Sequence, residues 1–156
     1  MIQLTSRWGK QVDVNNPLLE YPRPNMVRDS YLNLNGEWEF EIDKSKSGIG
    51  RKLYEADKLG GKIIVPFCPE SSLSGVGETD FLNAVWYKRT INRPDKNNRI
   101  IRHIGACDYK TILYINGKKV GVHKGGYTSF SFDITEYVQE YPDATFTLLY
   151  MLPGAS

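Results

Sequence analysis

The sequence predicts an all-β fold, an antiparallel β-sandwich. Short runs in which apolar and polar residues alternate recur along most of its 156 residues, as expected for strands with one buried face. Turn-forming residues separate these runs at a spacing that is typical of sandwiches and barrels. One pair, Asn116-Gly117, lies between two such runs, and Asn-Gly is the strongest short-range signal for a two-residue hairpin.

The composition and charge of the chain argue against several classes of protein. Charged residues make up 24% of the chain and hydrophobic residues 40%, which is typical of neither disordered nor membrane proteins. A chain of this length suits one domain that buries roughly 70% of its unfolded surface. The net charge of +2 and the lack of a dense basic stripe argue against a nucleic-acid partner. No apolar run reaches the length of a bilayer span, and the start does not resemble a signal peptide, so we expect a cytoplasmic location without a membrane partner.

The cysteines and histidines predict neither a metal site nor a cofactor site. Cys68 and Cys107 are the only cysteines, too few for a disulfide framework, and we expect free buried thiols. His103, Cys107, Asp108 and His123 lack the close ligand pairs of a structural zinc site. We therefore interpret them as core or loop residues and predict no metal, no cofactor and no Cys/His nucleophile.

An extended arm is predicted at residues 1–34, ahead of a sandwich at 35–156. Three prolines restrict the backbone of this arm. Trp8 lies within it and is expected either to anchor the arm on the sandwich or to contact other domains, because isolated exposed aromatic residues often mark interfaces.

The first half of the sandwich has two predicted strands. The first covers residues 36–42, and the second is a short apolar strand at 62–65 that Pro66 ends. The segment 44–61 between them is rich in glycine and charge, with one irregular helical turn near 53–59. A long loop from 67 to about 84 follows, and loops of this length are usually functional or disordered.

The second half has six predicted strands. They cover residues 85–92, 99–105, 110–116, 118–123, 129–134 and 145–151. Within the alternating strands, Trp38 and Trp86 are interpreted as core residues, because aromatic residues at period 2 normally fill a sandwich interior. An exposed aromatic binding platform is the alternative.

Two glycine-containing turns are predicted between these strands. Asn116-Gly117 should form a type I′ turn with positive φ at both residues. Gly125-Gly126 is interpreted as a turn of the backbone with Tyr127 packed back onto the fold, because paired glycines mostly serve backbone geometry. A functional glycine loop is the alternative interpretation.

Five stretches resemble one known family. Residues 105–135, GACDYKTILYINGKKVGVHKGGYTSFSFDIT, closely resemble the signature of the N-terminal sugar-binding domain of glycoside hydrolase family 2. This is the family of β-galactosidases, β-glucuronidases and β-mannosidases. YPRPN at 21–25, LNLNGEWEF at 32–40, IVPF at 64–67 and VWYKRTI at 85–91 also resemble family sequences, in the family's order.

The resemblance implies a jelly-roll-like, galactose-binding-domain-like sandwich that packs against a catalytic (β/α)8 barrel. In the family the barrel carries both catalytic glutamates, and such a barrel needs ~250 residues. The implied function is therefore a non-catalytic sugar-binding and scaffolding domain of an enzyme that acts on β-glycosides, with no catalytic residue in this chain. The implied partners are a carbohydrate, in the context of the full enzyme, and the downstream sandwich and barrel domains of the same polypeptide. The last strand departs from the family's usual Asn-x-Leu-x-Val-x-Val ending.

A row of carboxylates requires a check against glycosidase chemistry. Glu37, Glu39 and Glu41 alternate along the first strand, which spaces neighbours ~7 Å apart. This overlaps the roughly 6.5–9.5 Å between the carboxylates of inverting glycosidases. Those carboxylates flank a bond from two sides, whereas these three stand in one row, so we interpret them as a solvated outer face.

The loop at 67–84 is the predicted functional segment. Asp80 and Asn83 offer the acceptors and amide that sugar hydroxyls require. By resemblance, this loop approaches the mouth of the barrel, which makes Asp80 and Asn83 the candidate substrate-binding residues. A plain disordered loop is the alternative.

Two other functions stay open at this point. An independent, lectin-like carbohydrate-binding module should present an exposed aromatic platform and bind sugar alone. A β-sandwich protein-interaction module should instead present a contiguous apolar patch.

Overall fold

A computed structural model describes residues 9–15, 29–93, 98–139 and 141–152. The chain divides into two compact units, the first Met1–Trp38 with Ile63–Thr79 and the second Glu39–Lys62 with Asp80–Ser156. Trp8 and the three arm prolines lie outside the described residues. The division into an arm at 1–34 and a sandwich at 35–156 stays a prediction.

The described elements are nearly all strands. In chain order they are η1 (Gly9–Gln11), β1 (Gly36–Ile42), β2 (Gly61–Val65), η3 (Ser72–Ser74), β3 (Ala84–Asn92), β4 (Ile101–Ile104), β5 (Lys110–Ile115), β6 (Lys118–Lys124), β7 (Phe130–Asp133), α1 (Thr135–Val138) and β8 (Asp143–Met151). The 3-10 helix η3 and the short helix α1 were not predicted, whereas each of the eight strands lies where the alternation predicts one.

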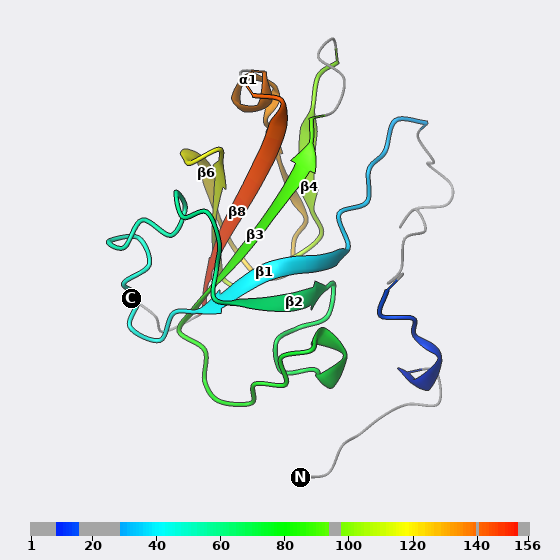
Figure 1. Cartoon of the computed structure of the whole chain (residues 1–156), viewed down its shortest axis with the longest axis vertical. Coiled ribbons are helices and arrows are strands. Elements are labelled where there is room, and N and C mark those ends of the chain that lie inside the picture. The colour runs from blue at the N-terminus through cyan, green and yellow to red at the C-terminus, as the bar shows by residue number, and fades with distance from the viewer. Residues whose placement is uncertain (1–8, 16–28, 94–97, 140, 153–156) are drawn as a thin grey trace. The chain divides into compact units, whose positions relative to one another are not determined.

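The strands form two sheets (Figure 1). The larger has the order β2-β1-β3-β8-β5-β6, and the smaller pairs β4 with β7. The pair β3–β8 runs antiparallel from Ala84 opposite Met151 to Asn92 opposite Asp143. β1–β3, β5–β8, β5–β6 and β4–β7 are antiparallel as well. The predicted all-β antiparallel fold is confirmed.

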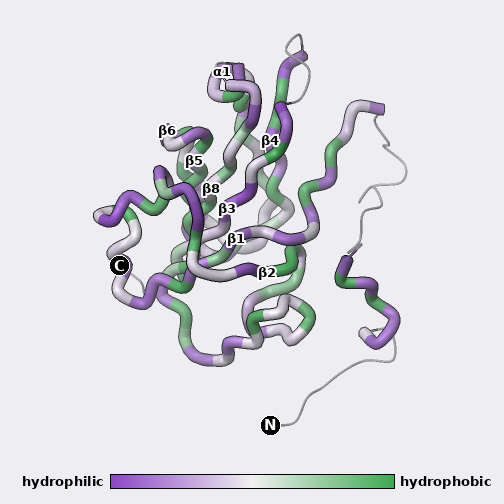
Figure 2. The backbone as a smooth tube through the Cα atoms, in the orientation of Figure 1, coloured by the Kyte–Doolittle hydropathy of each residue, from purple (hydrophilic) through white to green (hydrophobic). Residues whose placement is uncertain are grey.

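One face of the larger sheet is covered by the segment between β1 and β2. Trp86, Leu149 and Ile112 are neighbours across β3, β8 and β5, and they pack against Leu53 and Leu59 of that segment. Trp86 has no exposed surface, which confirms its predicted place in the core. β3 itself changes from apolar to hydrophilic along its length (Figure 2).

The opposite face of the larger sheet packs against the small sheet. The Tyr87 ring lies 5.0 Å from the Tyr150 ring, and the Arg102 guanidinium on β4 lies 5.9 Å from the centre of the Phe146 ring on β8. The Arg102–Phe146 contact joins the two sheets, as in a sandwich, whereas Tyr87 and Tyr150 both belong to the larger sheet.

The hairpin between β5 and β6 has the predicted turn. The φ angle is 49° at Asn116 and 78° at Gly117. Asn116 has a second role that the sequence pattern does not reveal: its Oδ1 accepts from Thr145 N at 2.9 Å, and its Nδ2 donates to Tyr137 O at 3.2 Å. The turn is thereby tied to the start of β8.

Two local predictions are wrong. The segment near 53–59 contains turns and no helix. The glutamates of β1 do not form a solvated row, because Glu39 Oε2 accepts from Leu59 N at 2.9 Å and Glu41 pairs with Arg51 at 2.9 Å. The chain between β1 and β2 folds over this face, a long-range event that alternation along one strand cannot reveal.

The predicted environments of two other residues also need correction. Tyr127 does not pack back, since 99% of it is exposed. Gly126 is required for space, because a Cβ at this position would come within 2.7 Å of the Asp108 carboxylate. Cys68 and Cys107 are both free, as predicted, but neither is fully buried: Cys68 is exposed and Cys107 is partly buried.

Candidate functional site

The loop between β2 and β3 is ordered by its own hydrogen bonds in the first unit. The Ser71 hydroxyl caps η3, and the Ser74 hydroxyl donates to Ser71 O at 2.7 Å. Glu78 N donates to Pro69 O at 3.0 Å, which closes the loop on itself. The loop therefore has a compact structure of its own within this unit.

The two predicted site residues belong to the second unit and converge on one neighbour, Lys44. Asn83 Nδ2 donates to Lys44 O at 2.8 Å, and Lys44 Nζ lies 3.9 Å from Asp80 Oδ2. The side chains of Lys44 and Asp80 are 62% and 77% exposed. Such an exposed pair adds little to stability.

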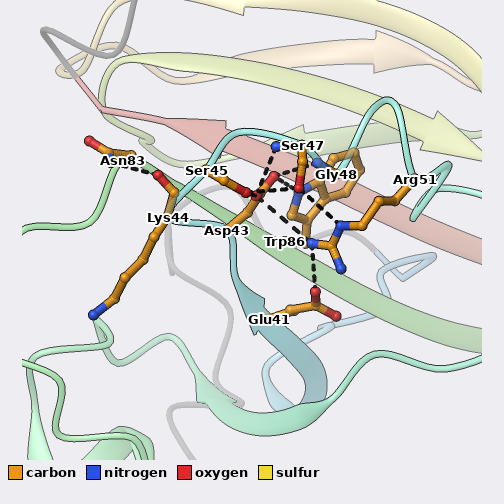
Figure 3. Close-up of polar contacts among 9 residues, drawn as sticks. All are labelled: Glu41, Asp43, Lys44, Ser45, Ser47, Gly48, Arg51, Asn83 and Trp86. Carbon is orange, nitrogen blue, oxygen red and sulfur yellow. Dashed lines mark hydrogen bonds and ion pairs between the residues drawn. The ribbon is translucent and has the colours of Figure 1, made fainter.

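The position of Lys44 is fixed by the residue before it. Asp43 N donates to Ala84 O at 2.9 Å, at the start of β3. The buried Asp43 carboxylate accepts from Ser47 N at 3.0 Å, Gly48 N at 2.7 Å and Trp86 Nε1 at 3.2 Å (Figure 3). One carboxylate thus ties the turn after β1 to the core tryptophan.

The charge of Asp43 is stabilised where it lies. Burial raises the pKa of this carboxyl, but the N–H donors of Gly48, Trp86 and Ser47, together with the Arg51 charge, outweigh burial and lower it below its usual value. The turn is also tightly packed, since a Cβ at Gly48 would lie 2.3 Å from Trp86 Nε1. Asp43 is therefore a positioning residue for the Lys44 backbone.

Sequence reasoning missed two members of this surface. Phe81 is 67% exposed and stands between the two predicted residues in the chain, and Lys44 reaches them from a different loop. The aromatic residue between the two polar residues was the available signal for Phe81. No local sequence signal indicated Lys44, because its position depends on the long-range turn at Asp43. Lys44, Asp80, Phe81 and Asn83 are called the Lys44 surface below.

The Lys44 surface offers binding groups of several kinds. An ammonium and an amide donate hydrogen bonds, a carboxylate accepts them, and the exposed ring of Phe81 provides an apolar face. Within the described ranges, no three His, Cys, Asp or Glu side chains gather in a way that could hold a metal ion. Nor is any described helix long and apolar enough to cross a bilayer.

Comparisons with known proteins agree on one family. The model of the sugar-binding domain of glycosyl hydrolases family 2 matches residues 72–149. A β-glucuronidase of Canis lupus familiaris is 31% identical over 134 residues, which are 78% of this chain and 20% of that protein. The β-glucuronidase of Homo sapiens is 26% identical over 147 residues, covering 86% and 22%. The chain thus spans about a fifth of the length of these relatives.

Solved structures show the same fold. A β-glucuronidase of Lactobacillus rhamnosus superposes with a TM-score of 0.72 at 22% identity, over 86% of this chain and 23% of that one. A Ruminococcus gnavus β-glucuronidase, in complex with a C6-substituted uronic isofagomine, superposes with a TM-score of 0.70 at 19% identity, over 81% and 23%. Since the family model covers half of the residues, from 72 to 149, the chain belongs to glycosyl hydrolase family 2, through the sugar-binding domain of that family.

Proposed function

We propose that this chain is the non-catalytic sugar-binding and scaffolding domain of a β-glucuronidase-like family 2 enzyme. In that enzyme, the Lys44 surface helps to shape a sugar subsite on a catalytic barrel of the same polypeptide. The observation that carries the proposal is the convergence of Asp80 and Asn83 on Lys44, which the buried Asp43 turn holds in place. The substrate class is taken from the relatives, which are named β-glucuronidases.

Exposure to water limits how strongly the Lys44 surface can bind a sugar by itself. Hydrogen bonds between exposed groups and a sugar exchange with water and yield little net free energy. The same bonds gain strength where a second surface excludes water. A surface as exposed as Asp80, at 77%, therefore needs a partner domain that covers it, and the downstream barrel is the partner we propose.

We do not expect this chain alone to hydrolyse a glycoside. Glycoside hydrolysis needs two carboxyl groups that face each other across the scissile bond. Glu39 and Glu41 are engaged in structural contacts with Leu59 and Arg51. The purified chain should therefore not hydrolyse aryl β-glucuronides. Turnover that a Glu39→Gln or Glu41→Gln variant abolishes would contradict the proposal.

The role of the loop is tested by kinetics in the complete enzyme. Asp80→Ala should lower kcat/KM on an aryl β-glucuronide and leave the melting temperature unchanged. Asp143→Ala is the matched control, because Asp143 is also an exposed aspartate but lies at the opposite end of the β3–β8 pair from Ala84. Equal kinetics for the two variants would remove Asp80 from the site. Tight sugar binding by the chain alone would favour the lectin-like module instead.

The cytoplasmic location stays a prediction.

A further inference from the structure

A cavity of about 330 Å³ opens on the second unit, away from the Lys44 surface. Tyr54, Asp57, Lys88, Thr90 and Thr145 are among the residues that line it, and none of the Lys44-surface residues does. This volume lies at the lower end of the ~300–1,000 Å³ range of small-molecule sites. It therefore suits a ligand of one ring rather than an oligomer.

Lys88 is the unusual group in the lining. It stands on the face of β3 that also carries Trp86, and only 6% of it is exposed. Burial lowers the pKa of its ammonium, while the charges of Glu39 and Asp57 raise it. Among the described residues, the ammonium nevertheless has neither a hydrogen bond nor an ion pair. Lys88 lines the cavity, so these donors are open to a ligand.

An unsatisfied hydroxyl lies directly across the strand pair, outside the cavity lining. Thr147 is opposite Lys88 in the β3–β8 register, and opposed residues share one face of a sheet. Thr147 is 1% exposed, and its hydroxyl has no hydrogen-bond partner within the described part of the chain. The next pair along, Thr90 and Thr145, joins its two hydroxyls at 2.8 Å. The Thr147 hydroxyl is thus the unsatisfied group on this part of the sheet, whereas the Thr90 and Thr145 hydroxyls satisfy each other.

The charges around the cavity select the kind of ligand. Glu55 and Asp57 also line it, and two carboxylates against one ammonium disfavour a further anion. A hydroxyl can accept from the ammonium and donate to a carboxylate at once. Tyr54, whose ring stacks on Tyr114 at 4.7 Å with an interplanar angle of 8°, provides a fixed aromatic wall.

We propose that this cavity is a second carbohydrate site, which binds one neutral monosaccharide ring with Lys88 as the main donor. Binding is weak, because Glu55 and Asp57 are exposed to water. Neither Asp80 nor Asn83 takes part in this site, so its test is independent of the test of the proposed function.

The experiment is an amide chemical-shift titration of the 156-residue chain with glucose, galactose and glucuronate, followed residue by residue. Saturable shifts are expected at Lys88, Thr90, Gly117 and Thr145, with glucuronate weaker than the neutral sugars. The absence of saturable shifts at these amides would overturn the inference, as would shifts confined to the Lys44 surface. Glucuronate binding as tight as that of glucose would overturn the assignment to neutral sugars.

Two variants separate binding from folding. Lys88→Met should weaken binding by about tenfold or more, as the loss of a hydrogen bond to a charged group implies, while stability is kept or increased because a buried charge is removed. Thr147→Val, of the same shape, should change binding little, because Thr147 does not line the cavity. Lys119→Met, at an exposed lysine of β6 outside the cavity lining, is the control. Unchanged affinity in a folded Lys88→Met variant would contradict the inference.

Discussion

At the scale of single residues, one buried carboxylate connects stability to the candidate site. Asp43 is 2% exposed and joins three parts of the chain, the turn after β1, the Trp86 indole and the Arg51 side chain, whose Nη2 lies 3.8 Å from Asp43 Oδ1. Because the same turn positions the Lys44 carbonyl that Asn83 contacts, a change at Asp43 should act on the site through geometry.

Asp43→Asn should lower the free energy of unfolding by about 1–3 kcal/mol at neutral pH, the cost of leaving buried polar groups mismatched. The folded pKa of Asp43 lies below its ordinary 3.8. Its contribution is therefore complete above that value and is lost as the pH falls through the folded pKa. Urea denaturation at neutral and acidic pH measures this, with Asp143→Asn as the exposed control. A wild-type advantage that persists unchanged in strong acid would contradict the assignment.

The two thiols should differ in reactivity. Cys68 is exposed, whereas burial raises the pKa of Cys107 to about 12. The thiolate is the reactive form, so Cys107 stays protonated and slow at neutral pH. Alkylation of the native chain followed by mass spectrometry should label Cys68 first, and denaturation should make the two rates similar. Faster labelling of Cys107 in the native chain would show that its surroundings are not as described.

At the scale of elements, the β5–β6 hairpin shows how local sequence fixes local structure. The Asn-Gly pair predicts a two-residue turn, and the φ angles at Asn116 and Gly117 are both positive. The contacts of the Asn116 side chain with Thr145 and Tyr137 come from residues distant in sequence. A substitution at Gly117 therefore tests the backbone alone.

Gly117→Val should cost roughly 1–3 kcal/mol through backbone strain. Space is not the obstacle, since a Cβ there would meet Glu55 Cγ at 3.5 Å, an ordinary contact. Gly105→Val is the control, because Gly105 has no heavy atom within 4 Å of its Cβ position and is not among the glycines with positive φ. Thermal unfolding of the two variants gives the comparison. Equal melting temperatures for the two variants would contradict the assignment of a type I′ turn at Asn116-Gly117.

The strands could be predicted because alternation and turn residues are local signals. β3 and β8 are examples, each within two residues of its predicted bounds. The cover over the glutamates of β1 could not, because it depends on Leu59 and Arg51 folding back from the next segment. The site divides in the same way: Asp80 and Asn83 could be selected as polar loop residues, whereas Lys44 joins them only through the turn at Asp43.

At the scale of the whole molecule, we propose that the chain is one part of a longer enzyme. It spans about a fifth of the length of the β-glucuronidases it matches, and the exposed polar groups of the Lys44 surface gain binding strength only when they are covered. The buried Asp43 turn gives this surface a fixed shape before any partner arrives. The fixed surface reduces the ordering cost of assembling a subsite between two domains.

The most direct test of this account is kcat/KM of the complete enzyme with Asp80→Ala and Asn83→Ala combined, measured on an aryl β-glucuronide against the Asp143→Ala control. We expect kcat/KM to fall by about tenfold or more, as the loss of water-excluded hydrogen bonds to substrate implies, with the melting temperature and the activity of the control unchanged. A double variant as active as the control would contradict the central claim that this domain shapes the sugar subsite.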